Sequence, residues 1–480
     1  MSMGEKSADQ VDLFVPHETV RRAAGHPFYE ALEKVLREAD FDRRVEKLCK
    51  KFYAERRGRP SIPPGVYFRC LMVGFFEGID SERGIAWRVA DSLSLRGFLG
   101  ISFGKSTPDH SSLSNIRRRL DLETHQEVFT MLLGKLAEHG LVKGKSVGVD
   151  ATTLEANAAL RSLVRREDGQ SYEDFLIELA KKSGIETPTR EDLAKIDRKR
   201  KKKGSNEEWV NPHEPDAEIM KMKKGGTRMA HKHEHAVDLE TGAILGSSLN
   251  GGARGDTKTL EETLVDADEN LQRVREEADE ETCSKVSETI EEVTADKGYH
   301  SNETLMAREA AEQRSYISEP KRGRRNWKNK KAERDAVYRN RKRLKRRKGK
   351  GLLRKRGELL ERPMEHLFNS GGMRRTHLRH HENISKRLLI HMSAFNLGIL
   401  MRELFGVGKP RRLQGRKDLL EALLTAFARF ATILCVVAAR LRGWRDVPKR
   451  SEEFPANFSF VLAQHSAGLS GRRTDFSTAC

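Results

Sequence analysis

Two short stretches of the sequence each put an aspartate directly after small and β-branched residues. Residues 145–152 are KSVGVDAT, and residues 293–299 are VTADKGY. Valine and threonine fit the pleated surface of a strand, whereas an ionised carboxylate at the rim of a buried sheet is costly unless it is paired or binds a metal. We therefore expect Asp150 and Asp296 each to end a strand. Two such strands side by side would bring both carboxylates within reach of one divalent cation.

A helix farther along the chain is expected to supply a third carboxylate. Glu358, Glu361 and Glu365 follow one another at i, i+3 and i+7, so one face of an unbroken helix would present all three. Pro363 must kink this helix or reset its start. Carboxylate oxygens suit Mg²⁺ or Mn²⁺, and two such ions can activate one oxygen and stabilise another during phosphoryl transfer. Taken singly, each acid is typical of a turn, a helix cap or a solvated surface.

A second group of possible metal ligands is a run of alternating histidines. His231, His233 and His235 lie on one face of a predicted strand that precedes the turn sequence DLETG. Alternate side chains on a strand splay along it, and neither a cysteine nor a second cluster in the sequence completes a site. We therefore favour histidines that face the sheet or DNA over a metal site.

The excess of positive charge predicts a polyanionic partner, with nucleic acid first. The 480 residues hold 90 Lys and Arg against 71 Asp and Glu, a net charge of +19. The stretch Lys321 to Lys350 alone has seventeen basic and two acidic residues, a net +15. Such a run is usually a solvated, partly disordered surface, but this one lies between candidate active-site elements, so we expect DNA contacts. The candidate contact residues there and beside the third acid are Lys328, Arg341, Lys342, Arg343, Arg356 and Arg362.

Short helices are predicted to precede the first aspartate. Helical spacing begins at Pro27, Pro63-Pro64 opens another helix, and Ser81 and Thr107-Pro108-Asp109 are further start signals. The last of these helices has three arginines, Arg117, Arg118 and Arg119. This pattern fits a helix-turn-helix that binds DNA, and it fits a helical packing or dimerisation domain equally well.

The region that holds both aspartates follows the order strand, hairpin, helix, strand, helix, strand. A polar helical stretch from Glu155 to about Ile196 is predicted between the first strand and the hairpin, and it ends in the basic run 197–203. After the hairpin we expect a long charged helix from Asp256 to about Ser287. This alternation predicts a mixed sheet with helices against it.

The sequence predicts a reduced, cytoplasmic chain without a membrane span. Its five cysteines are scattered, and the N-terminus is polar. The apolar stretch Leu419 to Leu441 contains Glu421, Arg429 and Arg440, which favours a packed amphipathic helix over a membrane span.

Several stretches in order resemble the DDE transposases of bacterial insertion sequences with an InsH-like N-terminal domain. Residues 58–100 match their N-terminal part, and VGVDATTLEANAA matches the stretch around their first acid. Residues 216–244 match the hairpin, and ADKGYHS matches the second acid. The last match is RGELLERPMEHLFNSGGMRRTHLRHHENISKRLLIHMSAFNLGILMR. With gaps, these stretches span residues 58–402.

The resemblance implies a ribonuclease H-like α/β core with a mixed sheet, an α-helical N-terminal domain and a helical C-terminal region. It implies DNA strand transfer of a mobile element at a two-metal site that binds Mg²⁺ or Mn²⁺. Asp150 and Asp296 match the first two acids, and Glu361 best matches the third, within Glu361-Arg362. Many relatives carry Tyr and Arg seven and four residues before that Glu, where this sequence has Arg354 and Gly357. Glu358 and Glu365 therefore stay open as alternatives.

The expected organisation has three parts. Residues 1–135 would form the helical DNA-binding or assembly domain, and residues 140–405 the catalytic domain with basic insertions near 155–225 and 321–355. Residues 406–480 would form a helical extension and tail. The expected partners are the terminal inverted repeats of the element and target DNA, bound by a homo-oligomer in a bacterial, nucleoid-associated setting. The alternatives are a metal-dependent DNA nuclease that does not join strands and an inactive DNA-binding protein derived from a transposase.

Overall fold

A computed structural model describes residues 25–54, 61–102, 104–200, 204–222, 225–321, 323 and 325–410. The predicted helix Leu419 to Leu441 and the tail lie outside these residues. The helices that precede the first strand are α1 (Pro27–Glu38), α2 (Phe41–Cys49), η1 (Lys50–Phe52), α3 (Pro64–Glu77), α4 (Glu82–Ala90), α5 (Leu93–Phe98), α6 (His110–Arg119) and α7 (Leu122–Glu138).

The helix starts that the sequence predicts are confirmed by their caps. The Ser81 hydroxyl accepts the N–H of Gly84 at 3.2 Å, and the Asp109 carboxylate accepts the N–H of Ser112 at 2.7 Å. The helical pattern that begins at Pro27 is divided in two, because Asp40 adopts a positive φ of 49° between α1 and α2.

The central sheet is mixed, as predicted. Its strand order is β4-β5-β1-β7-β8, and β6 pairs with β5. The antiparallel strands are β1 (Ser146–Glu155), β4 (Glu218–Lys221), β5 (Thr227–Asp238) and β6 (Ile244–Gly251). The strands β7 (Glu292–Ala295) and β8 (Arg314–Ile317) run parallel to β1. The turn between β5 and β6 uses Gly242 at a φ of 82°, as the sequence predicts for a short hairpin.

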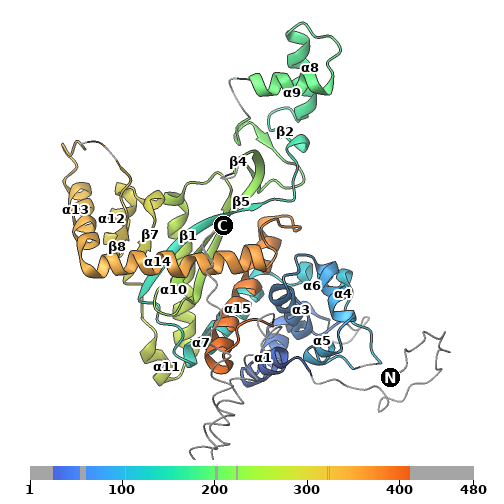
Figure 1. The fold of residues 1–480 in the computed structure, drawn as a ribbon, viewed down its shortest axis with the longest axis vertical. Helices are drawn as coiled ribbons and strands as arrows, with labels where there is room; N and C mark the ends of the chain where they lie inside the picture. Colours follow the sequence, from blue (N-terminus) through green and yellow to red (C-terminus); the bar gives the residue numbers. More distant parts are fainter. Residues whose placement is uncertain are drawn as a thin grey trace, which may run out of the picture. The chain divides into compact units, whose positions relative to one another are not determined.

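Helices cover both faces of this sheet (Figure 1). The helix α10 (Asp256–Glu277) packs on β5 and β6, and α11 (Glu280–Lys285) follows it, so the single helix expected to reach Ser287 is divided in two. On the other face, α14 (Arg347–Met364) crosses β1, β7 and β8 and continues as the π-helix η4 (Glu365–Ser370). A Cβ at Gly148 of β1 would lie 2.6 Å from Leu360 Cδ1, so the glycine allows α14 to approach the sheet.

The predicted helical stretch from Glu155 to Ile196 is wrong over much of its length. Strand β1 continues to Glu155 because Ala151–Glu155 pair with β5. The insertion then contains η2 (Leu160–Ser162), β2 (Val164–Arg165), α8 (Tyr172–Lys182), α9 (Arg190–Lys199) and β3 (Trp209–Val210). Its apolar side chains form two small clusters of their own, one around Trp209 and one around Leu176.

The basic run from Lys321 to Lys350 is largely helical. After η3 (Lys297–Tyr299) and α12 (Asn302–Ala310), it forms α13 (Lys331–Lys345) and the first turn of α14. Ala336 and Val337 of α13 are buried against the rest of the protein, which fixes this helix even though most of its residues are charged. The run therefore presents its charges from an ordered scaffold.

Helix α15 (His381–Phe405) is long and apolar enough to cross a membrane by length and composition alone. It packs instead on α7, α3 and β6, and 72% of its most apolar window is buried inside the protein. One hydrophobic core contains residues of this helix, of the N-terminal helices and of the sheet. The predicted division of the chain near residues 135–140 stays a prediction.

Candidate functional site

Asp150 lies in the middle of strand β1, so the prediction that it ends the strand is wrong. Five further residues of β1 pair with β5 after it, and Asp150 itself is opposite His235. Residues alternate between the two faces of a strand, so Asp150 shares the face of Gly148, against which α14 packs. Its carboxylate therefore lies beneath the helix that was expected to supply the third acid.

Asp296 directly follows β7, as predicted, and begins η3. Its Oδ1 accepts the N–H of Gly298 at 2.7 Å. The parallel pairing of β1 with β7 joins Val147 to Val293 and Gly148 to Thr294. Continued by two residues, this register sets Asp150 beside Asp296, and neighbouring strands are about 4.8 Å apart. The sheet would therefore bring the two predicted acids into one row.

Arg356 of α14 forms an ion pair with Asp150. Its Nη2 donates to Asp150 Oδ2 at 2.7 Å, and the two side chains are only 17% and 26% exposed. The position next to the Asp150 carboxylate is therefore one where positive charge is favoured. Arg356 was expected to contact DNA; here its partner is the first acid.

Glu358 and Glu361 of α14 and Glu365, the first residue of η4, are all exposed. Leu360 is buried against the sheet, and Leu359 and Met364 pack at the edge of the core, as expected. Pro363 neither ends nor resets the helix, because α14 continues through it before the π-helical turn. The side chain of Glu361 has no hydrogen bond or ion pair to any described residue, and the choice among Glu361, Glu358 and Glu365 stays a prediction.

A buried acid on the opposite face of the sheet is Glu234 of β5. It accepts hydrogen bonds from Tyr299 at 2.6 Å, Thr259 at 2.8 Å and Thr263 at 2.7 Å. Burial raises the pKa of Glu234. Because Glu234 pairs with Ala151 and not with Asp150, it faces α10 and belongs to the core beneath the site.

The three histidines of β5 lie on a covered face of the sheet and are buried. They are therefore sheet-face histidines and not DNA-facing ones. His231, His233 and His235 are 0% exposed. Burial lowers the pKa of His235 to about 4, so this ring is neutral near pH 7. His233 packs against Phe368 of the π-helix. DNA could not reach any of the three in this arrangement.

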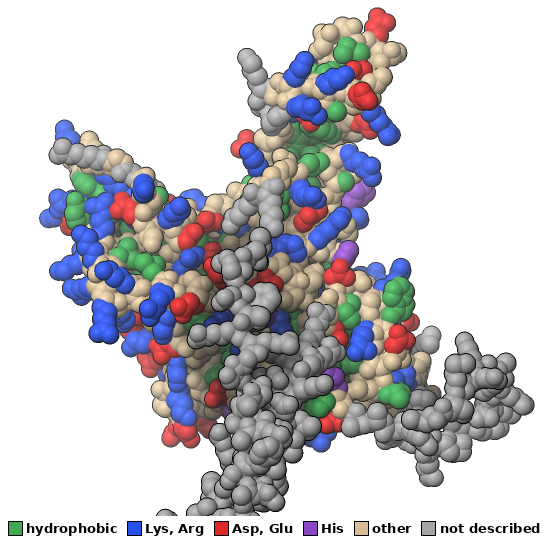
Figure 2. Space-filling model, in the orientation of Figure 1, with side chains coloured by type: hydrophobic (Ala, Val, Ile, Leu, Met, Phe, Trp, Pro, Cys, Tyr) green, Lys and Arg blue, Asp and Glu red, His purple; other side chains and the backbone are tan. Residues whose placement is uncertain are grey.

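The structure sorts the predicted DNA-contact residues into two sets. Arg117 is mostly buried and paired with Glu82, Arg341 is paired with Glu319, and Arg343 donates to Ser315. The side chains that reach solvent are Arg118, Arg119, Lys328, Lys342 and Arg362. Figure 2 shows Lys and Arg side chains gathered over the region of α12 and α13.

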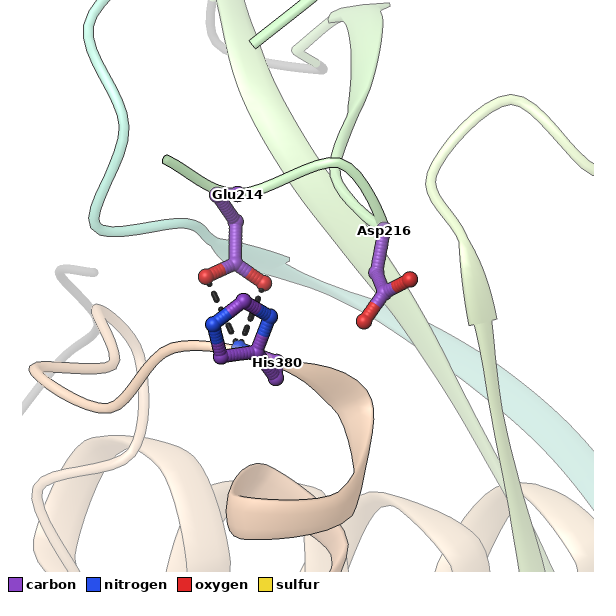
Figure 3. A group of neighbouring side chains, drawn as sticks. All are labelled: Glu214, Asp216 and His380. Carbon is purple, nitrogen blue, oxygen red and sulfur yellow. Dashed lines mark hydrogen bonds between the residues drawn. The ribbon is translucent and has the colours of Figure 1, made fainter. Parts of the chain in front are cut away.

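Three carboxylate and imidazole side chains approach one another closely enough to share an ion, and the sequence had not brought them together. Among the described residues, the side chains whose ligand atoms lie close enough to bind one ion are Glu214, Asp216 and His380 (Figure 3). They are not the three acids predicted from the sequence. Glu214 and Asp216 precede β4, and His380 precedes α15, so 164 positions separate the nearest of these segments along the chain. No spacing rule connects residues so far apart.

Carboxylate oxygens are the ligands that Mg²⁺ and Mn²⁺ prefer, and the Asp150–Asp296 row provides them. The ion pair of Asp150 with Arg356 shows that a positive charge is accommodated there. These residues therefore fit a divalent metal, and an ion would have to displace or join the guanidinium. A third ligand from α14 would complete the set.

Comparison with known protein families gives two matches. A transposase domain (DUF772) matches residues 16–119, and a transposase DDE domain matches residues 182–397. The second match contains Asp296 and Glu361, and its fold is ribonuclease H-like, in agreement with the mixed sheet. Asp150 lies between the two matched segments, so its assignment depends on the strand register. No curated protein matches the sequence.

Proposed function

Since the chain carries both of these domains and is a DDE transposase of the insertion-sequence type, we propose that it cleaves the ends of a mobile element and joins them to target DNA. The observation that supports this proposal is the parallel pairing of β1 with β7, whose register, continued by two residues, would set Asp150 beside Asp296. Two neighbouring carboxylates beneath a helix rich in Arg and Glu suit phosphoryl transfer, in which an attacking oxygen replaces the leaving oxygen on a DNA phosphate.

Each residue would have a distinct part in this reaction. Asp150 and Asp296, with Glu361 from α14, would bind divalent metal. Bound Mg²⁺ or Mn²⁺ would activate the attacking oxygen and stabilise the leaving oxygen. Arg356 would exchange its contact with Asp150 for the phosphate next to the scissile bond, because guanidinium binds carboxylate and phosphate with the same geometry.

The exposed basic residues would hold the DNA backbone without reading its sequence. Lys328 and Lys342 extend from the ordered basic run, and Arg362 lies beside Glu361. Phosphate contacts set the position of the duplex. In this proposal the N-terminal helices recognise the terminal inverted repeats or assemble the oligomer, and the protein works in the bacterial cytoplasm on nucleoid DNA.

A strand-joining assay tests this function. Purified full-length protein is incubated with Mg²⁺ or Mn²⁺, a labelled duplex that ends in the inverted repeats flanking the gene, and supercoiled target DNA. We expect nicks that leave 3′ hydroxyls, followed by covalent joining to the target. Cleavage without joining would favour the nuclease, and metal-independent DNA binding without cleavage would favour the inactive protein.

A further inference from the structure

A polar cluster away from the Asp150–Asp296 row joins three distant segments of the chain. Glu214 and Asp216 come from the segment before β4, His380 lies just before α15, and His231 belongs to β5. One ligand atom each of Glu214, Asp216 and His380 lies within 4.8 Å of the other two (Figure 3). His231 is four residues from His235 along β5, which places it about 13 Å from the row that contains Asp150.

The two carboxylates are partly explained as helix caps. Both oxygens of Glu214 accept the backbone N–H of His380 at 2.8 Å, and Asp216 Oδ2 accepts the N–H of His381 at 3.0 Å. These N–H groups at the start of α15 lack partners within the helix, and negative charge is favourable there. Capping alone would account for the acids, but it leaves the nitrogen atoms of the cluster unexplained.

The Nε2 atom of His231 lacks a hydrogen-bond partner among the described residues. The His231 side chain is 0% exposed, and its Nε2 makes no hydrogen bond to any described residue. This atom points at Glu214 Oε1 from 3.5 Å, too far for a good hydrogen bond. On the other side of the ring, Nδ1 lies 3.0 Å from His381 Nε2. A buried nitrogen without a partner costs free energy, which a cation beside Glu214 would recover.

The cluster combines a buried carboxylate with a second acid and an imidazole. Glu214 is 0% exposed, and burial raises its pKa. Asp216 is its acidic neighbour, and the His380 ring lies beside the Glu214 carboxylate (Figure 3). Ligands of this mixed oxygen and imidazole type favour Zn²⁺ and similar transition metals over Mg²⁺.

We propose that Glu214, Asp216 and His380 bind one Zn²⁺ ion, with His231 Nε2 as the adjacent fourth donor. Four oxygen and nitrogen donors match the tetrahedral preference of this ion. The contact of His231 with His381 would orient the ring, as a partner on the second nitrogen of a ligating histidine usually does. His380 is exposed to solvent, so an ion can reach the group from that side. The ion would pin the segment before β4 to the start of α15.

The test compares Zn²⁺ binding by the full-length protein and by variants that retain the fold. His380 adopts a φ of 67°, a backbone conformation that glycine tolerates better. The His380→Gly variant should therefore fold at least as well as the wild type in the absence of metal. It should nevertheless bind Zn²⁺ at least about tenfold more weakly, as should Asp216→Asn. His213→Ala is the matched control, because this exposed neighbour is outside the group, and it should bind as the wild type does.

Zn²⁺ is measured by equilibrium dialysis with elemental analysis, and the fold by circular dichroism and thermal unfolding. One ion per chain is expected for the wild type, for His213→Ala and for Asp150→Asn. Equal affinity of His380→Gly and wild type would overturn the site, as would equal losses in all variants or no Zn²⁺ bound by the wild type. Because Asp150→Asn removes the proposed catalytic ligand alone, failure of the transposase proposal and failure of this one are distinguishable.

Mn²⁺ gives an independent spectroscopic readout. Bound by the Asp150–Asp296 row, Mn²⁺ would have only oxygen ligands from the protein, whereas at the second cluster it would have imidazole nitrogen. Pulsed electron paramagnetic resonance of the Mn²⁺-loaded Asp150→Asn protein should therefore show ¹⁴N coupling, and His380→Gly should reduce it. Absence of nitrogen coupling in Asp150→Asn would overturn the assignment of His380 as a ligand.

Discussion

The Asp150–Asp296 row and the cluster around Glu214 bring acids together by different means. In the proposed row, the register of two neighbouring strands, continued by two residues, would align the carboxylates, and an arginine from the covering helix pairs with one of them. In the cluster, three segments meet at the start of a helix, and the acids accept backbone N–H groups there. The row provides oxygen ligands near basic residues, whereas the cluster adds imidazoles, the buried His231 and the exposed His380. We therefore propose DNA chemistry for the first site and a structural ion for the second.

Loss of either aspartate of the row should have the largest effect. Asp150→Asn and Asp296→Asn are each expected to lower Mg²⁺-dependent DNA cleavage by more than about a thousandfold, because a lost ligand removes several kcal/mol of transition-state stabilisation. DNA binding, measured by fluorescence anisotropy, should persist since phosphate contacts remain. Asp91→Asn, at an exposed position in the N-terminal helices, is the control. Wild-type cleavage by either row variant would reject the row as the catalytic site.

Variants of Glu358, Glu361 and Glu365 test whether a glutamate of α14 or of the following η4 supplies the third metal ligand. Glu361→Gln is expected to lower cleavage by more than about a hundredfold, about 3 kcal/mol of transition-state stabilisation. Glu358→Gln and Glu365→Gln should stay within a few-fold of wild type, because these residues lie about a turn away on either side and a turn is about 5.4 Å along the axis. If Glu361→Gln is active and Glu358→Gln or Glu365→Gln is inactive, the third ligand is Glu358 or Glu365. The proposed roles of the two aspartates would not change.

The basic run tests whether the surroundings of the row bind DNA without reading its sequence. The triple variant Lys328→Ala, Lys342→Ala, Lys345→Ala removes three exposed charges. It should weaken binding to cognate and unrelated duplexes alike and reduce the slope of log K against log salt by up to about 3, since each phosphate contact contributes about 0.9. Arg341→Ala removes a charge already paired with Glu319 and should change the slope less. A loss confined to cognate DNA would contradict this role.

Removing the contact of Arg356 with Asp150 should have the smallest effect, a change in the affinity for Mn²⁺. Arg356→Ala removes the cation that competes for the carboxylate, so Mn²⁺ should bind the DNA-free protein several-fold more tightly, about 1 kcal/mol in binding free energy. Arg354→Ala is the control, because Arg354 is 79% exposed and lies near Glu358 instead. The measurement is titration calorimetry with Mn²⁺ in the Asp216→Asn background, which removes the second cluster. Weaker binding by Arg356→Ala would show that the arginine supports the site and does not compete for it.

Local chemistry allowed much of the fold to be predicted from the sequence. Ser81, Asp109 and Gly242 indicated helix starts and a hairpin because caps and turns depend on residues a few positions apart. The strands before Asp150 and Asp296 were predicted from β-branched residues next to small ones. The end of β1 could not be predicted in this way, because Asp150 is retained inside the strand by its pairing with β5, which is a long-range contact.

The sequence by itself determined that Asp150, Asp296 and a helix glutamate are the candidates for metal binding, and that basic residues surround them. Only the tertiary structure decided that Arg117, Arg341 and Arg343 are engaged within the protein, while Lys328 and Lys342 reach solvent. It also brought His231 next to Glu214 and His381. Three histidines on one strand cannot converge on an ion, since alternate side chains stand side by side along it. The missing ligands had to come from other segments, and packing, which spacing along a chain does not encode, brings them there.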